Sequence, residues 1–251
     1  MPFIKPAPMS EVDSTEWDTY HQVHESHYTT ESLVCEVDDP FREYLPAPSN
    51  QRLLDIGCGQ SSLVLKYAGL GSHATGRDVN QTALNCLRRR LISLGQEANG
   101  RVTLQEGLFP KFRPSEMNFT LAVVKDVLHF YTDSEQSDIL GKLDEHLVQG
   151  SYIFIKCRSE KHFVAIDPSR DSRYKSFFNP SSMRSLFNAV KYDCLWTKSF
   201  EEYHSESDKE FMRKWFAKSY PTLSKDELES ELSWYLSEGP MMTESALFRK
   251  R

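Results

Sequence analysis

The run from Leu53 to Ser61 constrains the fold of this chain more than any other stretch of its sequence. It reads Leu-Leu-Asp-Ile-Gly-Cys-Gly-Gln-Ser, an apolar segment with an acid near its end, followed by two glycines. Gly57 and Gly59 permit a tight turn and let a ligand approach the backbone closely. A helix that begins after such a turn presents free N–H groups to that ligand. The run therefore predicts a strand, a turn and a helix that meet in the ligand crevice of an open α/β sheet.

Short apolar runs and helical stripes alternate along the chain from residue 52 onward. The expected strands cover 52–56, 73–78, 101–105, 119–125, 151–157, 190–200 and 243–249. Helices are expected over 61–68, after Asn80 as an N-cap, from Asp133 or Ser134 until Gly150, and over 180–189, 207–220 and 224–236. Strands that alternate with helices imply a mostly parallel sheet covered on both faces. We therefore expect an α/β fold with a seven-stranded, mostly parallel sheet, an antiparallel last strand and extra C-terminal helices.

Aromatic and histidine residues recur with helical spacing in the segment 16–28. They are Trp17, Tyr20, His21, His24 and Tyr28, and they would share one helix face. No acid or cysteine completes a metal set with these histidines, so no metal is expected. The prolines near the N-terminus indicate an extended arm. We expect residues 1–50 to form an arm and a helical lid, and residues 51–251 to form a single Rossmann-like domain.

The glycine turn is similar to the first motif of the class I S-adenosylmethionine-dependent methyltransferases, an acid followed by G-x-G-x-G. Asp55, Gly57 and Gly59 match that pattern, Cys58 lies between the glycines, and Ser61 replaces the third glycine. The resemblance implies a class I methyltransferase of small-molecule type. It also implies S-adenosylmethionine as cofactor, S-adenosylhomocysteine as product, and a cofactor contact at Asp55 and at the residues from Gly57 to Gly59.

A second acid, Asp78, ends the expected strand 73–78, nineteen positions after Gly59. A carboxylate there can accept two hydrogen bonds from a ribose diol. The resemblance, which covers 16–251 in layout, gives Asp78 this role and places Val79 against the adenine ring.

Three further cofactor contacts are implied by the resemblance alone. Leu108 stands where the family often has an acid that holds the adenine amino group, so we expect backbone or packing contacts there. Lys125 ends the expected strand 119–125, beside which the family binds the methionine moiety. Tyr28 lies in the N-terminal segment, which commonly covers the cofactor.

Candidates for chemistry at the methyl acceptor follow the fourth expected strand. Asp126 and His129 lie where the family's next turn faces the acceptor, and either is a candidate general base if the acceptor must lose a proton. Ordinary packing in a turn is the plain alternative for His129. An amine acceptor needs only a neutral lone pair, in which case no base is required.

Four more residues are candidates for substrate contacts. Lys156 and Arg158 follow the fifth expected strand, where a solvated loop is an equal alternative. Trp17 and Tyr20 lie on the expected lid, and an aromatic face there would favour the cationic sulfonium.

Composition and missing motifs exclude several classes of partner. With a net charge of −6, the chain lacks the excess of positive charge that is typical of a nucleic-acid binder. We expect the run from Arg88 to Arg90 to be a solvated helix face. No N/D-P-P-Y/F/W tetrapeptide follows the fourth strand, which disfavours methylation of nucleic-acid bases. Five cysteines without a C-x-x-C pair indicate reduced thiols, and no apolar run reaches about 20 residues. We expect a cytoplasmic protein without a membrane or nucleic-acid partner; its oligomeric state is not predicted.

These observations favour methyl transfer by in-line displacement onto a nitrogen or oxygen atom of a small organic molecule. Aromatic residues of the C-terminal third suit a closed pocket, or a plain core: Phe211, Trp215, Phe216, Tyr220, Trp234 and Tyr235. The alternatives are a methyltransferase that acts on protein or RNA, a non-catalytic module with the same fold, and a nicotinamide-binding Rossmann protein. The last is disfavoured because Ser62 stands where its G-x-G-x-x-G fingerprint needs the third glycine.

Overall fold

The computed structural model describes residues 14–35, 39–109, 118–166, 173–237 and 240–251, and the expected N-terminal arm lies outside them. The strands are β1 (Arg52–Ile56), β2 (His73–Asp78), β3 (Val102–Glu106), β4 (Phe119–Lys125), β5 (Leu147–Arg158), β6 (Tyr192–Glu202) and β7 (Met241–Lys250). The helices are α1 (Ser14–His27), α2 (Thr30–Cys35), α3 (Ser62–Gly69), α4 (Gln81–Ser93), α5 (Gln96–Gly100), α6 (Asp133–His146), α7 (Phe163–Ile166), α8 (Pro180–Arg184), α9 (Glu206–Ser219) and α10 (Lys225–Ser237).

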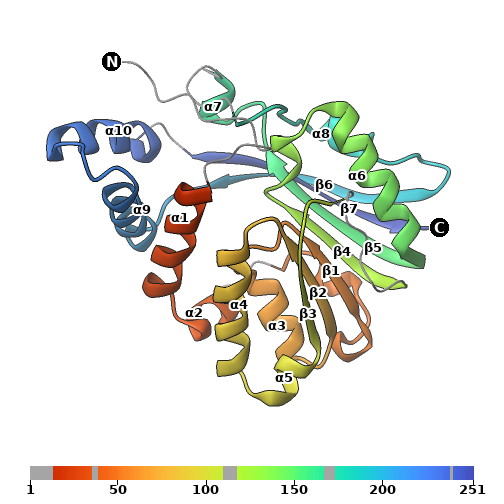
Figure 1. Cartoon of the computed structure of the whole chain (residues 1–251). Coiled ribbons are helices and arrows are strands. Elements are labelled where there is room, and N and C mark those ends of the chain that lie inside the picture. Colours follow the sequence, from red (N-terminus) through yellow and green to blue (C-terminus); the bar gives the residue numbers. More distant parts are fainter. Residues whose placement is uncertain (1–13, 36–38, 110–117, 167–172, 238–239) are drawn as a thin grey trace.

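The strands form one sheet in the order β3-β2-β1-β4-β5-β7-β6 (Figure 1). Neighbours from β3 to β5 pair in parallel, whereas β7 runs antiparallel to both β5 and β6. The predicted seven-stranded sheet with an antiparallel last strand is therefore confirmed. The strand order reverses between β1 and β4, and open α/β sheets bind ligands beyond the carboxyl ends of the strands at such a point.

Two adjacent residues of β1 pack into two separate hydrophobic cores, one on each face of the sheet. Leu53 packs in the core that contains α3 and α4, and Leu54 packs in the core that contains α6 and α8. Both side chains are fully buried, because successive strand residues point to opposite faces of a sheet that is covered on both sides. The two cores hold the strand ends in place and leave the carboxyl edge to carry the site.

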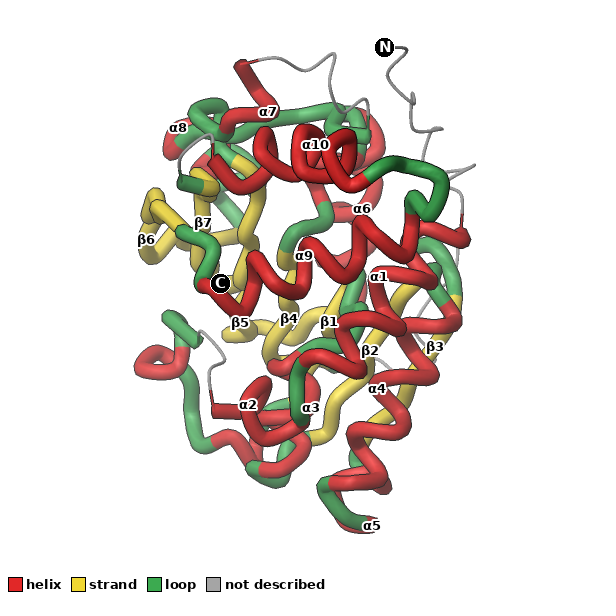
Figure 2. Tube along the Cα trace, turned by 90° about the vertical axis from the view of Figure 1, so that its left-hand side faces the viewer, coloured by secondary structure: helices red, strands yellow, loops and turns green. Residues whose placement is uncertain are grey.

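A third hydrophobic cluster lies away from the sheet. It joins Val23 of α1 with Phe211, Trp215 and Phe216 of α9 and Leu232 of α10. Figure 2 shows these three helices together on one side of the molecule. They form the predicted N-terminal cover and the predicted extra C-terminal helices, and we call α1, α9 and α10 the lid.

Two predicted boundaries around α6 are wrong. The N-cap is Thr132, not Asp133 or Ser134, because its side chain accepts a hydrogen bond from the Glu135 N–H, while the Glu135 carboxylate binds the Thr132 N–H in return. The helix ends at His146 and the chain passes directly into β5. Gly150 therefore lies inside that strand, with a φ of 81°, and does not end the helix.

The helix expected over 180–189 is also shorter, since α8 covers only Pro180–Arg184. Asn188 makes a turn after it: its side chain accepts from the Val190 N–H, and its carbonyl accepts from Tyr192 at the start of β6. Asparagine favours such turns over helix. Helices α2, α5 and α7 were not predicted, because four to six residues are too few to show a helical stripe.

Candidate functional site

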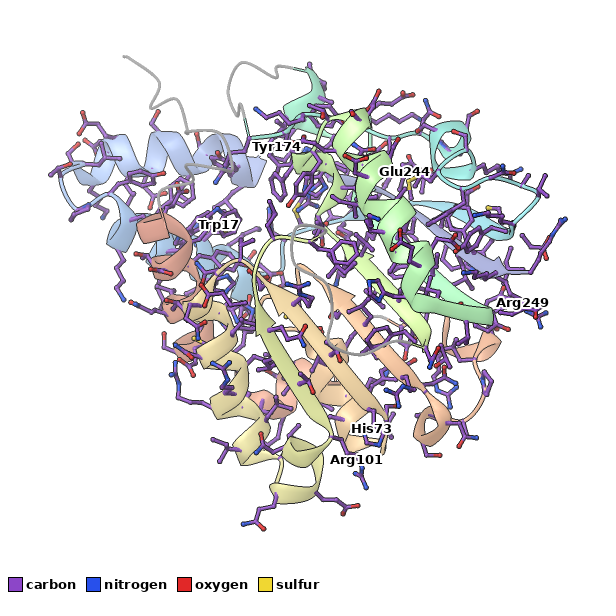
Figure 3. All side chains as sticks on the ribbon, turned by 45° about the vertical axis from the view of Figure 1, so that its right-hand side comes forward. Trp17, His73, Arg101, Tyr174, Glu244 and Arg249 are labelled. Atoms are coloured by element: carbon purple, nitrogen blue, oxygen red, sulfur yellow. The ribbon has the colours of Figure 1, made fainter. Side chains whose placement is uncertain are left out.

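A cavity of about 1130 Å³ lies at the carboxyl ends of β1, β2, β4 and β5, beneath the lid. In Figure 3, Trp17 and Tyr174 lie toward this end of the sheet, whereas His73 and Arg101 lie at the opposite end. Every site residue predicted from the sequence, for cofactor, acceptor or chemistry, lines this one cavity. Pockets for one small ligand are roughly 300–1,000 Å³, so this volume suits two molecules bound together.

The glycine turn has a backbone that other residues would strain. Gly57 and Gly59 have φ angles of 68° and 51°, in the left-handed region where glycine carries no penalty. A Cβ atom at Gly57 would overlap the side chain of Val127, the second residue after β4. The turn is thus shaped both by its own conformation and by the adjacent strand.

Asp78 closes the turn from the end of β2. Its carboxylate accepts hydrogen bonds from the Gly59 N–H at 2.7 Å and from the Asn80 N–H at 2.8 Å. Burial raises the pKa of Asp78, while the backbone N–H groups act in the opposite direction. The Val79 N–H also interacts with this carboxylate. A carboxylate has about four acceptor positions, so acceptor capacity stays available for a ribose hydroxyl.

Ser61, which replaces the third glycine of the family motif, has two structural contacts. Its hydroxyl donates to Asp55 Oδ2 at 2.5 Å and accepts from the Val64 N–H at 3.2 Å, as the N-cap of α3. Burial raises the pKa of Asp55 to about 7, although the Ser61 hydrogen bond and the positive charge of Lys125 each lower it. Ser61 therefore connects Asp55 to the first turn of α3. The motif pattern alone does not reveal this role.

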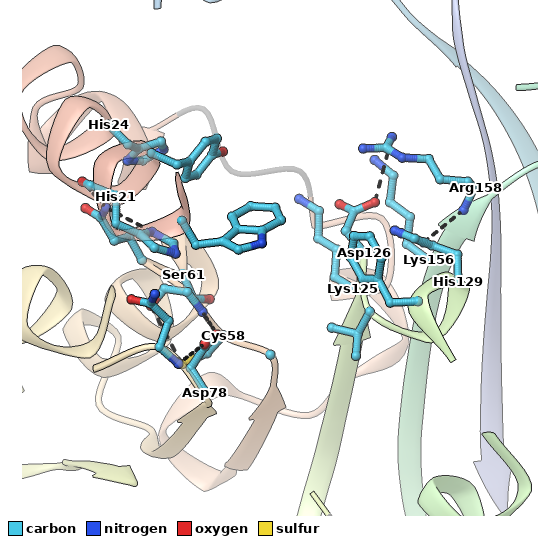
Figure 4. Close-up of a pocket in the computed structure, with 18 of the residues that line it drawn as sticks. His21, His24, Cys58, Ser61, Asp78, Lys125, Asp126, His129, Lys156 and Arg158 are labelled. Carbon is cyan, nitrogen blue, oxygen red and sulfur yellow. Dashed lines mark hydrogen bonds and ion pairs between the residues drawn. The ribbon is translucent and has the colours of Figure 1, made fainter. Parts of the chain in front are cut away.

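The remaining cofactor candidates line the same part of the cavity. Val79 is 49% exposed, although it is apolar, which suits a surface that packs against a flat ring. Leu108 and Cys58 line the same part of the cavity as Val79. Lys125 lies at the end of β4, between this part of the cavity and Asp126 (Figure 4). The exposed Val79, the glycine turn and the free acceptor positions of Asp78 fit an adenosine group.

On the other side of the cavity, Asp126 faces a group of cations (Figure 4). Its φ of 57° is in the left-handed region, and its N–H donates to the Lys156 carbonyl at 2.9 Å. Burial would raise the pKa of Asp126, but the charges of Arg158, Lys125 and Lys156 lower it to about 2. Asp126 is therefore ionised at any physiological pH.

His129 is buried beside Arg158. The Arg158 backbone N–H donates to His129 Nδ1 at 3.3 Å, and Tyr174 stacks on the imidazole with ring centroids 5.1 Å apart. Burial, and then the Arg158 charge, lower the pKa of His129 to about 3. A neutral ring that accepts at Nδ1 carries its proton on Nε2, which makes His129 a hydrogen-bond donor at that atom.

Aromatic side chains of the lid form the cavity wall opposite β4 and β5. Tyr20 makes edge contacts with Phe211 and Trp215, each with ring centroids 5.1 Å apart, and Trp17 lies 6.5 Å from Phe130. The Tyr28 hydroxyl donates to Asp208 Oδ1 of α9 at 2.6 Å. These predicted contact residues therefore join the N-terminal helix to the C-terminal helices.

The arginine run on α4 is not the solvated face that the sequence predicted. Arg88 is exposed and Arg89 forms a two-pronged pair with Glu25 of α1. Arg90, however, is buried and donates to the Tyr28 carbonyl at 2.9 Å, to the His24 carbonyl at 3.3 Å, and to Gln60. It satisfies the free carbonyls at the C-terminus of α1 and fixes the lid to the sheet.

Sequence reasoning missed several partners of the predicted residues. Glu202 of β6 forms an ion pair with buried Lys156, Asp208 accepts from Tyr28, and Tyr174 stacks on His129. These residues lie 46, 180 and 45 positions from their partners along the chain, so no local sequence pattern connects each pair. Among the described residues, no three His, Cys, Asp or Glu side chains are placed to hold a metal ion. In the same part of the chain, no helix has both the length and the apolar character needed to cross a membrane.

Comparison with known proteins identifies the kinds of protein that this chain resembles. Residues 54–153 match a family model described as a methyltransferase domain. A search of curated proteins by sequence found no match.

Solved structures resemble the chain over most of its length. An S-adenosylmethionine-dependent methyltransferase from Thiobacillus denitrificans, in complex with S-adenosylhomocysteine, has 18% identity and a TM-score of 0.64 over 94% of this chain and 97% of that one. One from Geobacter sulfurreducens, also with S-adenosylhomocysteine, has 17% identity and a TM-score of 0.63 over 94% and 98%. Coclaurine N-methyltransferase, bound to N-methylheliamine and S-adenosylhomocysteine, has 12% identity and a TM-score of 0.60 over 83% and 69%.

Identities this low describe a likeness of fold. Residues 54–153 match a methyltransferase domain model, and the fold of the chain is like that of class I S-adenosylmethionine-dependent methyltransferases. S-adenosylmethionine is the cofactor of this class. The antiparallel β7 next to β5 also separates the sheet from the dinucleotide-binding order 3-2-1-4-5-6.

Proposed function

We propose that this protein transfers a methyl group from S-adenosylmethionine to a nitrogen or oxygen atom of a small organic molecule. The observation that carries the proposal is the single cavity beneath the lid, which joins the Asp78 side and the Asp126 side. Its far wall is aromatic and comes from helices that pack on one another. A space covered in this way suits a small acceptor better than a protein or RNA chain, which needs an open groove.

In this proposal the cofactor half of the site is Asp55, Gly57, Cys58, Gly59 and Asp78, with Val79, Leu108, Lys125 and Tyr28 around it. Asp78 holds the ribose diol and Val79 packs on the adenine. When bound, the cofactor would supply its sulfonium methyl group to the acceptor lone pair, with S-adenosylhomocysteine as the leaving group and any proton of the acceptor atom released to solvent.

On the acceptor side, Trp17, Tyr20, Lys156, Arg158 and His129 surround the reacting atom and exclude water from it. Neither predicted base is a strong one: the pKa of Asp126 is lowered to about 2, and the Nδ1 lone pair of His129 is occupied by the Arg158 N–H. Holding the acceptor close to the methyl group and in line with it then supplies most of the acceleration. This favours an acceptor that reacts through a neutral nitrogen lone pair, or a hydroxyl that ionises readily.

The remaining expectations belong to the same proposal. Residues 1–50 act as arm and lid, residues 51–251 as one domain, and the protein works in the cytoplasm without a nucleic-acid or membrane partner. The acidic net charge of −6 supports the absence of a nucleic-acid partner.

Calorimetric titration with S-adenosylmethionine and S-adenosylhomocysteine tests the cofactor half, with NAD as the control ligand. We expect micromolar binding of the first two and none of NAD. Asp78→Ala should weaken both by about 10- to 100-fold, because hydrogen bonds to a charged group are lost. Asp138→Ala, on the exposed side of α6, is the matched control and should bind as the wild type does. Absence of binding, or a preference for NAD, would contradict the proposal.

The nature of the acceptor is tested with methyl-labelled S-adenosylmethionine and a cell extract separated by size. Label in the low-molecular-weight fraction supports a small acceptor. Label that stays with protein or RNA would instead establish the macromolecular alternative.

A further inference from the structure

Arg158 presents a positive charge to the cavity with part of its hydrogen-bonding capacity unused. Its backbone is fixed, since its N–H donates to His129 Nδ1 and its carbonyl accepts from the Phe178 N–H at 3.0 Å. The guanidinium behaves differently: Nε is buried without a hydrogen-bond partner, and Nη1 lies 3.8 Å from Asp126 Oδ1, beyond hydrogen-bond distance. A buried donor without a partner is costly, and Tyr174 and Asp126 are the side chains that interact most with this guanidinium.

Asp126 has the complementary property. Its Oδ1 atom is also buried without a hydrogen-bond partner, although it lies closest to Arg158. The two groups therefore face the same space from the ends of β4 and β5, each held by its backbone (Figure 4). Other atoms of both side chains are accessible, since 17% of the Arg158 side chain and 36% of the Asp126 side chain are exposed, and both line the cavity. A single ligand with an anionic oxygen group and a neighbouring N–H or O–H donor would contact both side chains at once.

The charges around this space favour an anion. Lys156 is neutralised by Glu202, and Arg173 by Glu16. Among the described residues, Lys125 forms no ion pair within 4 Å, and the carboxylate nearest to Arg158 is Asp126, at 3.8 Å. Asp55 and Glu202 interact with Lys125 and Arg158 from further away. The positive sulfonium of the cofactor adds to the imbalance. An acceptor that carries a negative charge would reduce this excess of positive charge.

The surrounding walls are aromatic. Tyr174 stacks on His129 beside Arg158, and Tyr20 lies across the cavity, where burial and the charge of Asp126 raise its pKa to about 12. Phe130 contacts both Trp17 and Tyr174, with ring centroids 6.5 and 5.3 Å apart. Flat aromatic walls around an anchored charge suit a planar ring that bears the anionic group.

We propose that the methyl acceptor is an aromatic carboxylic acid, whose carboxylate binds the Arg158 guanidinium and whose neighbouring N–H or O–H group donates to Asp126. The planar guanidinium matches a carboxylate in a two-pronged arrangement. A carboxylate carries one negative charge and a phosphate monoester about two, so an aryl phosphate is the competing probe in the test below. This assignment rests on the proposed methyltransferase function, because it presumes that S-adenosylmethionine occupies the other half of the cavity.

The test is a ligand-observed NMR titration of the protein saturated with S-adenosylhomocysteine, whose binding is measured first on every sample. The probes are benzoate, the neutral isostere benzamide, 2-aminobenzoate and phenyl phosphate. We expect benzoate to bind about 10- to 100-fold more tightly than benzamide, the ratio for a hydrogen-bonded charge. 2-Aminobenzoate should bind more tightly than benzoate, because its amine reaches Asp126.

Variants then assign the preference to one side chain. Arg158→Gln should abolish the difference between benzoate and benzamide while S-adenosylhomocysteine still binds, and Arg158→Lys should retain part of it. Arg88→Gln, an exposed arginine outside the cavity, should keep the wild-type ratio.

Each other outcome has a definite meaning. Equal binding of benzoate and benzamide to the S-adenosylhomocysteine-bound wild type overturns the carboxylate assignment and leaves the methyltransferase function standing, and so does tighter binding of phenyl phosphate than of benzoate. Preference retained in Arg158→Gln overturns the role of Arg158. Failure of S-adenosylhomocysteine to bind would overturn the proposed function itself, and this inference with it.

Discussion

The two halves of the cavity are built over very different distances along the chain. In the cofactor half, Ser61 binds Asp55 six residues away, and Gly59 binds Asp78 nineteen residues away. In the acceptor half, Tyr20 of α1 packs on Phe211 and Trp215 of α9, which lie 191 and 195 residues further along the chain. One half is a local motif on the sheet, whereas the other is an assembly of separate helices. The first is therefore recognisable in a sequence, and the second becomes visible only when the lid has docked.

We therefore expect mutations in the two halves to have different consequences. A change in the cofactor half meets a rigid backbone that has no alternative conformation. A change in the lid meets helices held by a few buried contacts, which can separate from the sheet while the sheet stays folded. Four predictions test this division, from the largest expected effect to the smallest.

Gly57→Ala should have the largest effect. The added methyl group overlaps Val127, and the φ of 68° is unfavourable for alanine. We expect the free energy of unfolding to fall by about 2–5 kcal/mol, with loss of S-adenosylhomocysteine binding, as measured by urea denaturation and calorimetry. Gly141→Ala, in an exposed and open position of α6, is the control and should be neutral or stabilising by about 1 kcal/mol. Wild-type binding by Gly57→Ala would show that the turn is not rigid.

Arg90→Met should release the lid. It leaves the carbonyls of His24 and Tyr28 and the Gln60 side chain without their donor, at an expected cost of about 2–4 kcal/mol. Hydrogen exchange should then rise strongly in α1 and little in β1. Arg88→Met on the same helix should change neither. An equal rise in both elements would mean that lid and sheet form one cooperative unit.

Asp126→Asn should lower turnover more than cofactor affinity. Asparagine tolerates the left-handed backbone at this position, so the substitution removes the charge beside Arg158 without straining the turn. We expect turnover of the true acceptor to fall about 10- to 100-fold, with S-adenosylmethionine binding unchanged. Asp138→Asn is the matched control. Unchanged turnover would remove Asp126 from the acceptor half.

Mild acid should loosen the lid without unfolding the sheet. Burial lowers the pKa of His21 and of His24 to about 4, from about 6.5 in an unfolded chain. Below pH 6.5 the undocked lid binds protons that the docked lid does not, so its stability is complete above that pH and falls toward pH 4. Tryptophan fluorescence should report this change, because Trp17 and Trp215 lie in the lid. His24→Gln should show a weaker dependence on pH, and a signal independent of pH would contradict the assignment.

The sequence predicted the sheet well because its strands are short apolar runs whose burial on both faces leaves little choice of structure. It failed at Gly150, where a glycine that resembles a helix end lies within β5 instead. It also failed at Arg90, since three adjacent arginines look alike until the helix places one of them under α1. In both cases the deciding partner lies far away along the chain.

The sequence by itself determined the turn that we propose binds the cofactor: the acid and glycines from Asp55 to Gly59 and the acid at Asp78. Local backbone conformation and a strand period of two leave such a motif few arrangements. Only the tertiary structure decided the acceptor half, where Arg158 meets Asp126 with unused hydrogen-bonding capacity and the lid supplies the aromatic wall. Contacts between distant segments depend on packing and desolvation, which no short pattern of residues encodes.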